Sequence, residues 1–154
     1  MQIAVLLDEE VEGVDSDKVL WPIAVTASTD DGNIPENLID RNLGTRWSSV
    51  VADGEWACFD LGAEMEISSV QIAFYNYALE NNWNFDIQIS SDGVTFTDVL
   101  TGKKSNHATQ NAETFELPEG TKARYVRYVG HGVHRKDGYF KGYYNSVTEF
   151  RINK

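Results

Sequence analysis

The chain of 154 residues has the length of one ordinary domain, and its hydrophobic fraction of 42% is sufficient for a core. The formal net charge of −11 disfavours nucleic acid as a partner, because duplex affinity depends on Lys and Arg neutralising phosphates. No apolar run approaches the roughly 18 residues that a membrane-spanning helix requires, so we do not expect insertion into a membrane.

The charge is unevenly distributed along the chain. Residues 1–100 contain 3 Lys or Arg and 19 Asp or Glu, whereas residues 101–154 contain 10 and 5, together with all three histidines. Solvated surface charge is the commoner explanation of such asymmetry, but a locally basic segment also suits an acidic ligand. The single cysteine, Cys58, excludes an internal disulfide and a cysteine-built zinc site, and its apolar alternation predicts a buried, unreactive thiol.

The first twenty residues are rich in Asp and Glu and lack the basic start of a signal peptide. We therefore predict a linker or N-terminal extension over residues 1–20 and one folded module over residues 21–154. Such a linker implies that the module belongs to a larger modular protein.

Beyond residue 20, short runs of Val, Ile, Phe, Tyr and Thr recur between clusters of Gly, Asn and Asp, and a helical period is almost absent. A short turn is predicted over residues 40–44. Strands are predicted over residues 70–74, 85–89, 94–99, 123–129 and 147–152. The turn Ser91-Asp92-Gly93 joins two of these strands in a hairpin, which we place at the centre of a sheet. The pattern predicts an all-β sandwich of two antiparallel sheets.

Several blocks of the sequence, in order, resemble the discoidin or F5/8 type C family. The blocks are Val25-Thr26-Ala27-Ser28, residues 37–48, residues 56–62, residues 85–93, residues 123–128 and residues 145–150. The resemblance covers roughly residues 21–154 and is nearest to family 32 carbohydrate-binding modules, particularly those attached to bacterial alginate lyases. The terminal cysteines that bridge many animal members are missing, which favours a bacterial source.

This resemblance implies a jelly-roll sandwich, a structural calcium and a sugar site in loops at one end. At the positions where the family has its calcium ligands, this sequence has Asn37, Asp40, Asn42, Thr45, Thr148 and Glu149. Taken singly, Asp40 is explained as a turn cap and Glu149 as a solvated strand residue, but their joint occurrence favours a hard cation with six to eight oxygen ligands. Arg46 and Trp47 are assigned to the framework, with Trp47 in the core and Arg46 paired with Asp60 or another nearby carboxylate.

A sugar site needs an aromatic face for the pyranose ring and polar donors around it. We expect these groups in the loops at residues 76–83 and 130–145, with a third contribution from residues 103–109. The loop at residues 130–145 is the stronger candidate, because so long a stretch without strand character is commonly functional. The predicted contacts are Asn76, Tyr77, Asn81, Trp83, His107, His134, Arg135, Lys136, Lys141, Tyr143, Tyr144 and Asn145.

The cations in these loops suit a uronic acid. Arg135 is the leading candidate for the acidic group, because a guanidinium binds a carboxylate bidentately and Lys cannot reproduce that geometry. A neutral sugar such as galactose is the alternative ligand, since family members with neutral ligands also use Arg or His.

The predicted function is that of a secreted, extracellular, bacterial module that binds an acidic, alginate-type oligosaccharide and catalyses nothing. No G-x-S-x-G, H-E-x-x-H or phosphate-loop motif occurs, so we expect lyase or hydrolase activity in another domain of the same polypeptide. The alternatives are a neutral-sugar module and a discoidin-like adhesion module. Adhesion to a membrane would need apolar spikes, whereas the candidate loops are polar and aromatic. We expect a monomer.

Overall fold

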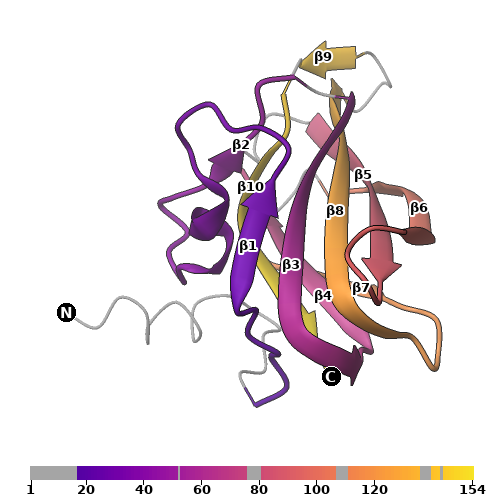
Figure 1. Ribbon diagram of the computed structural model, residues 1–154. Helices are drawn as coiled ribbons and strands as arrows, with labels where there is room; N and C mark the ends of the chain where they lie inside the picture. The colour runs from indigo at the N-terminus through magenta and orange to yellow at the C-terminus, as the bar shows by residue number, and fades with distance from the viewer. Residues whose placement is uncertain (1–16, 52, 76–80, 107–110, 136–139, 143) are drawn as a thin grey trace.

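Two antiparallel sheets pack face to face in the computed structural model, which describes residues 17–51, 53–75, 81–106, 111–135, 140–142 and 144–154 (Figure 1). The larger sheet has the order β1 (Ala24–Ala27), β3 (Asp53–Glu66), β8 (Lys122–Arg135), β5 (Asn81–Ser90) and β6 (Thr97–Lys104), with β9 (Phe140–Gly142) paired to β8. The smaller sheet has the order β2 (Trp47–Ser48), β10 (Ser146–Asn153), β4 (Ser69–Phe74) and β7 (Glu113–Glu116). One 3-10 turn, η1 (Pro35–Ile39), precedes β2. The predicted all-β sandwich is confirmed.

The predicted hairpin is present, but its second strand differs in position. Strand β6 begins at Thr97, and the carboxylate of Asp92 accepts the backbone N–H groups of Val94 and Thr95 at 2.9 Å each, which holds that stretch in a turn. Strand β6 pairs with β5 alone in the sheet order and therefore lies at an edge. Our placement of the hairpin at the centre of a sheet was wrong.

Strand β8 is longer than the sequence predicts. Residues 130–135, which we expected to be a loop, continue the strand and pair with the start of β5, and residues 140–142 form β9 against Val133 and His134. The expectation of a long stretch without strand character was therefore wrong for these residues. Gly130, His131 and Gly132 interrupt the apolar alternation that marks a strand in sequence.

Pairing at the N-terminal side begins before the predicted boundary at Trp21. Val19 bridges to Asn153, the backbone N–H of Leu20 donates to Ile152 O at 2.7 Å, and Lys154 N–H donates to Lys18 O at 2.9 Å. The folded part thus includes residues 18–20, which we had assigned to the linker. Residues 1–16 lie outside the described residues.

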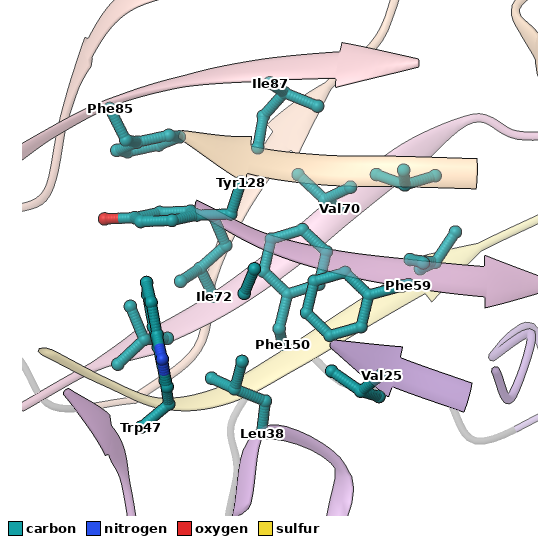
Figure 2. Packing of buried hydrophobic residues seen from close by; sticks show 14 of the residues in the cluster. Val25, Leu38, Trp47, Phe59, Val70, Ile72, Phe85, Ile87, Tyr128 and Phe150 are labelled. Carbon is teal, nitrogen blue, oxygen red and sulfur yellow. The ribbon is translucent and has the colours of Figure 1, made fainter. Parts of the chain in front are cut away.

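The core fills the space between the two sheets, where inward-facing residues of each strand meet (Figure 2). Phe59 of β3 stacks on Phe150 of β10, with ring centroids 4.3 Å apart and an interplanar angle of 9°. Trp47 is fully buried, and its indole N–H donates to Thr29 O at 3.0 Å. The prediction of Trp47 as a core residue is confirmed.

Cys58 lies on the opposite side of β3 from this core and is only half-buried, so the prediction of a fully buried thiol was wrong. Burial still raises the pKa of Cys58 to about 11, which keeps the thiol protonated and unreactive at neutral pH. Within the described ranges, no helix has the length and apolarity needed to cross a bilayer.

Candidate functional site

One end of the sandwich brings together segments that are far apart in the sequence. Ser146 at the start of β10 pairs with Ser48 of β2, and Val147 pairs with Phe74, so Tyr75 follows at the same end. In the other sheet, Asn81 at the start of β5 pairs with Arg135 at the end of β8. The indole N–H of Trp83 donates to Tyr75 O at 2.9 Å and joins the two sheets. We call this region the loop end, comprising Ser48, Tyr75, Asn81, Trp83, Arg135, residues 144–146 and their neighbours.

The aromatic residues of the loop end differ in exposure. Trp83 is 2% exposed, whereas Tyr144 is 39% exposed and packs edge-on against Trp83 with ring centroids 5.6 Å apart. A buried indole offers no face to a sugar, so Trp83 does not make the predicted sugar contact. Instead, its ring packs against Tyr144 and supports it. Tyr144 keeps the exposed ring that stacking on a pyranose requires.

Asn145, another predicted contact, is fully buried and connects the loops instead. Its Oδ1 accepts the backbone N–H of Gly132 at 2.8 Å, and its Nδ2 donates to Ser49 Oγ at 3.1 Å. An added Cβ at Gly130 would meet the Asn145 side chain at 2.2 Å, so only glycine leaves room for it. Asn145 therefore fixes the shape of the loop end without reaching its surface.

The predicted cations lie on both sides of the start of β5. Arg135 pairs with Asn81 on one side, and exposed Lys104 pairs with Asn84 on the other. His134 is half-buried, and its Nε2 lies 3.3 Å from His131 O. The side chains of Asn81, Arg135 and Lys141 are not described, although their backbone lies in strands β5, β8 and β9. The remaining predicted contacts, Asn76, Tyr77, His107, Lys136 and Tyr143, lie outside the described residues.

Sequence reasoning missed a bridge made by His131. Its Nδ1 lies 2.6 Å from Asp53 and its Nε2 lies 2.8 Å from Asp86, so one ring connects β3, β8 and β5. Burial lowers the pKa of His131, but the hydrogen bonds to the two carboxylates outweigh burial and raise it. No spacing in the sequence marks this bridge, because the three residues meet only through the sheet order.

Arg46 has a different environment from the one predicted. Asp60 is instead paired with Arg124, whose Nε and Nη2 lie 2.9 and 3.2 Å from the carboxylate oxygens of Asp60. The guanidinium of Arg46 lies 4.3 Å above the ring centre of Tyr75, and its Nε–H donates to Ser48 Oγ at 3.1 Å. The predicted pairing of Arg46 with Asp60 was wrong. The other carboxylate that the charge of Arg46 reaches is Asp31, although no hydrogen bond joins the two side chains. Through Ser48 and Tyr75, Arg46 belongs to the loop end.

The candidate metal ligands meet at the turn after η1. Asp40 accepts the N–H of Asn42 at 3.0 Å and also the hydroxyl of Thr45, and Glu149 accepts the N–H of Arg41 at 3.2 Å. Arg41 has a φ of 61°, a left-handed conformation that bends the turn toward β10. The turn and the last strand are thus brought together as the sequence predicts.

The charges at this turn favour a hard cation. Glu149 is 1% exposed, and burial raises its pKa to about 8 even though Arg151 donates to it at 3.0 Å. Asp40 raises the pKa of Glu149 further, and burial raises the pKa of Asp40 itself. Glu149 is buried and Asp40 is exposed, and the two carboxylates repel each other across the edge of the turn. A divalent cation between them would relieve this repulsion.

The donor set at this turn is rich in oxygen and poor in other ligands. Among the described residues, no three His, Cys, Asp or Glu side chains gather as a metal site, so a cation here would depend on carbonyl and hydroxyl oxygens as well. The Asn37 amide donates to Arg46 O at 2.8 Å and the Thr148 hydroxyl to Ala73 O at 2.9 Å, which leaves the backbone carbonyls of Asn37 and Thr148 for this role. Such a set fits calcium better than zinc.

Comparison with known proteins agrees with this architecture. The model of the F5/8 type C domain family matches residues 24–146. The structure of truncated AlyQ with CBM32 and alginate lyase domains is 36% identical, with a TM-score of 0.79, and the match covers 88% of this chain but only 33% of that one. A comparison with curated proteins finds no match.

Two isolated modules align over almost their whole length. CBM32 of AlyQ in complex with 4,5-unsaturated mannuronic acid is 36% identical, with a TM-score of 0.78 and coverage of 87% of this chain and 96% of that one. A pectin-binding carbohydrate-binding module is 25% identical, with a TM-score of 0.76 and coverage of 88% and 92%. This chain therefore corresponds to the binding module of such proteins and to about a third of the two-domain AlyQ chain.

Proposed function

Since this chain belongs to the F5/8 type C domain family and is a carbohydrate-binding module, we propose that its ligand is an acidic oligosaccharide of the uronate type, bound at the loop end. The observation that carries the proposal is the 36% identity to a module whose structure contains unsaturated mannuronic acid. The chemistry of the loop end supports it, because Tyr144 offers an exposed ring and Lys103, Lys104 and Arg46 supply cations to a protein with a net charge of −11.

Isothermal titration with oligomannuronates and with neutral manno-oligosaccharides tests this proposal. We expect binding to the acidic ligand, weaker binding in added salt, and at least about tenfold weaker binding to the neutral ligand, since loss of one charge-assisted contact is worth about 1.5–3 kcal/mol. Arg135→Ala should weaken uronate binding by a similar factor. Lys122→Ala, an exposed cation at the far end of β8, is the control and should bind as the wild type does. Equal affinity for acidic and neutral ligands would contradict the proposal.

We further propose that the module carries a polysaccharide lyase or glycoside hydrolase to its polymer and acts outside a bacterial cell. The AlyQ structure, in which a CBM32 accompanies an alginate lyase domain, supports this combination. Polysaccharides too long to cross a cell envelope are met outside it, which supports an extracellular location.

We also propose that calcium occupies the turn after η1 and is held by Asp40, Glu149 and Thr45, with carbonyls from Asn37, Asn42 and Thr148. When bound, the cation would supply positive charge to the buried carboxylate of Glu149 and the exposed carboxylate of Asp40. It would stabilise the native state without taking part in sugar binding, because it joins the turn to β10.

Removal of calcium should therefore lower the melting temperature. A site filled at one hundred times its Kd contributes about 2.7 kcal/mol, which corresponds to a shift of about 5–10 °C for a domain of this size. Calorimetry with and without a chelator measures the shift. Asp40→Asn should melt lower than the wild type and should no longer respond to the chelator. An unchanged melting temperature, with no metal found by elemental analysis, would contradict the calcium site.

A further inference from the structure

We propose that Arg46 binds the carboxylate of the sugar and gives the module its preference for acidic over neutral ligands. This inference rests on the proposed function, which it deepens by naming the residue that distinguishes the two ligand classes. It replaces the framework role that the sequence predicts for Arg46.

The orientation of the Arg46 guanidinium is fixed on two sides. Its Nε–H donates to Ser48 Oγ at 3.1 Å, and Ser48 Oγ lies 2.8 Å from Ser146 Oγ. Both serines are no more than 1% exposed, and because Ser48 accepts from Arg46 its own proton is available to Ser146. One face of the guanidinium is covered by the ring of Tyr75 at 4.3 Å.

These contacts leave the outer edge of the guanidinium without a hydrogen bond. Within the described part of the chain, no acceptor bonds Nη1 or Nη2 of Arg46. The nearby carboxylate of Asp31 accepts two bonds from Asn33 at its Oδ1, at 2.8 and 3.0 Å. Burial raises the pKa of Asp31, but these bonds and the charge of Arg46 lower it, so Arg46 acts on Asp31 through charge and not through a hydrogen bond. By contrast, Arg124 and Arg151 each donate to a carboxylate. A half-buried arginine with an oriented and open fork is suited to an acidic ligand from outside.

The guanidinium of Arg46 and the exposed ring of Tyr144 both belong to the loop end. The ring of Tyr75 lies against Arg46, and the backbone oxygen of Tyr75 accepts the indole N–H of Trp83 at 2.9 Å. Trp83 in turn packs against Tyr144. Ser146, which completes the serine pair, follows Tyr144 by two residues. A bound oligosaccharide would contact Tyr144 with one sugar ring and Arg46 with a carboxylate.

The fork distinguishes ligands by shape as well as by charge. Two parallel N–H groups match the two oxygens of a carboxylate, whereas a sugar hydroxymethyl group offers one oxygen and no charge. A lysine ammonium keeps the charge and loses the bidentate geometry. Arg46→Lys is therefore the informative substitution.

Titration of wild type and Arg46→Lys with oligomannuronates and neutral manno-oligosaccharides tests the inference. We expect Arg46→Lys to bind the uronate at least about tenfold more weakly and the neutral ligand as the wild type does. Arg124→Lys makes the same change at an arginine already paired with Asp60 and should leave both affinities unchanged. Melting temperatures confirm that each variant is folded.

Ser48→Ala is a second variant that keeps the guanidinium and removes the acceptor that orients it. Ser48→Ala should weaken uronate binding several-fold. If Arg46→Lys does not fold, the affinity of Ser48→Ala for the uronate tests the role of Arg46 instead. Uronate binding unchanged in the folded Arg46→Lys variant would overturn the inference and leave the proposed function intact. A wild type that does not prefer uronate would contradict the proposed function itself.

Discussion

Gly130→Ala should destabilise the module by about 3–5 kcal/mol, because the new methyl group would overlap a buried side chain that cannot move without losing its hydrogen bonds. The added Cβ would lie 2.2 Å from Cγ and Oδ1 of Asn145. If Asn145 moves away, the N–H of Gly132 and the hydroxyl of Ser49 lose a partner in a buried region. Chemical denaturation monitored by tryptophan fluorescence measures the loss.

Two further variants isolate the cause of this effect. Gly102→Ala places the same methyl group where nothing lies within 4 Å, so only its φ of 61° is costly, by about 1–2 kcal/mol. Asn145→Ala should itself destabilise, but adding Gly130→Ala to it should cost little more, because the overlapping side chain is gone. Additive losses in the double variant would contradict the proposed overlap.

Phe150→Ala should cost about 3–5 kcal/mol of stability by leaving a cavity between the sheets. Phe150 is 2% exposed, stacks on Phe59 at 4.3 Å and meets Tyr128 edge-on at 6.3 Å, so both sheets lose contacts at once (Figure 2). Phe150→Leu keeps most of the volume and should lose clearly less.

The same denaturation experiment includes a surface control. Ile23 is 70% exposed, and Ile23→Ala should change the free energy of unfolding by no more than about 0.5 kcal/mol. A loss below about 1 kcal/mol for Phe150→Ala would show that the two sheets do not depend on this contact.

The sheet strands were predictable wherever one face is buried and the period of two is intact. Phe85 and Ile87 are buried in β5 and alternate there with the half-buried polar residues Asn84, Asp86 and Gln88. The extension of β8 was not predictable, because Gly130 and Gly132 have no side chains to continue the pattern. Their strand pairing is imposed by β5, a neighbour in space that the local sequence does not reveal.

The candidate site was predictable by residue type more than by role. Trp83 and Asn145 have the chemistry of sugar contacts, but burial decides their role, and burial depends on the packing of both sheets. Arg46 was assigned to the framework as the expected partner of Asp60 or another nearby carboxylate. Its guanidinium lies over Tyr75, 29 positions away, and donates to Ser48, whose hydroxyl contacts Ser146 in the last strand. Only the fold brings these residues together.

Strand β6 lies at the edge of its sheet, which matters when many copies of the module are close together. An open strand edge is a template for pairing with another molecule, and that hazard grows when many copies gather on one polymer chain. Strand β6 is mostly exposed, ends in Lys103 and Lys104, turns through Gly102 at a positive φ, and pairs with β5 in an irregular register. Repulsion between lysines and a bent, irregular edge both oppose strand addition. The edge strand is thus built in a way that disfavours pairing between neighbouring copies of the module.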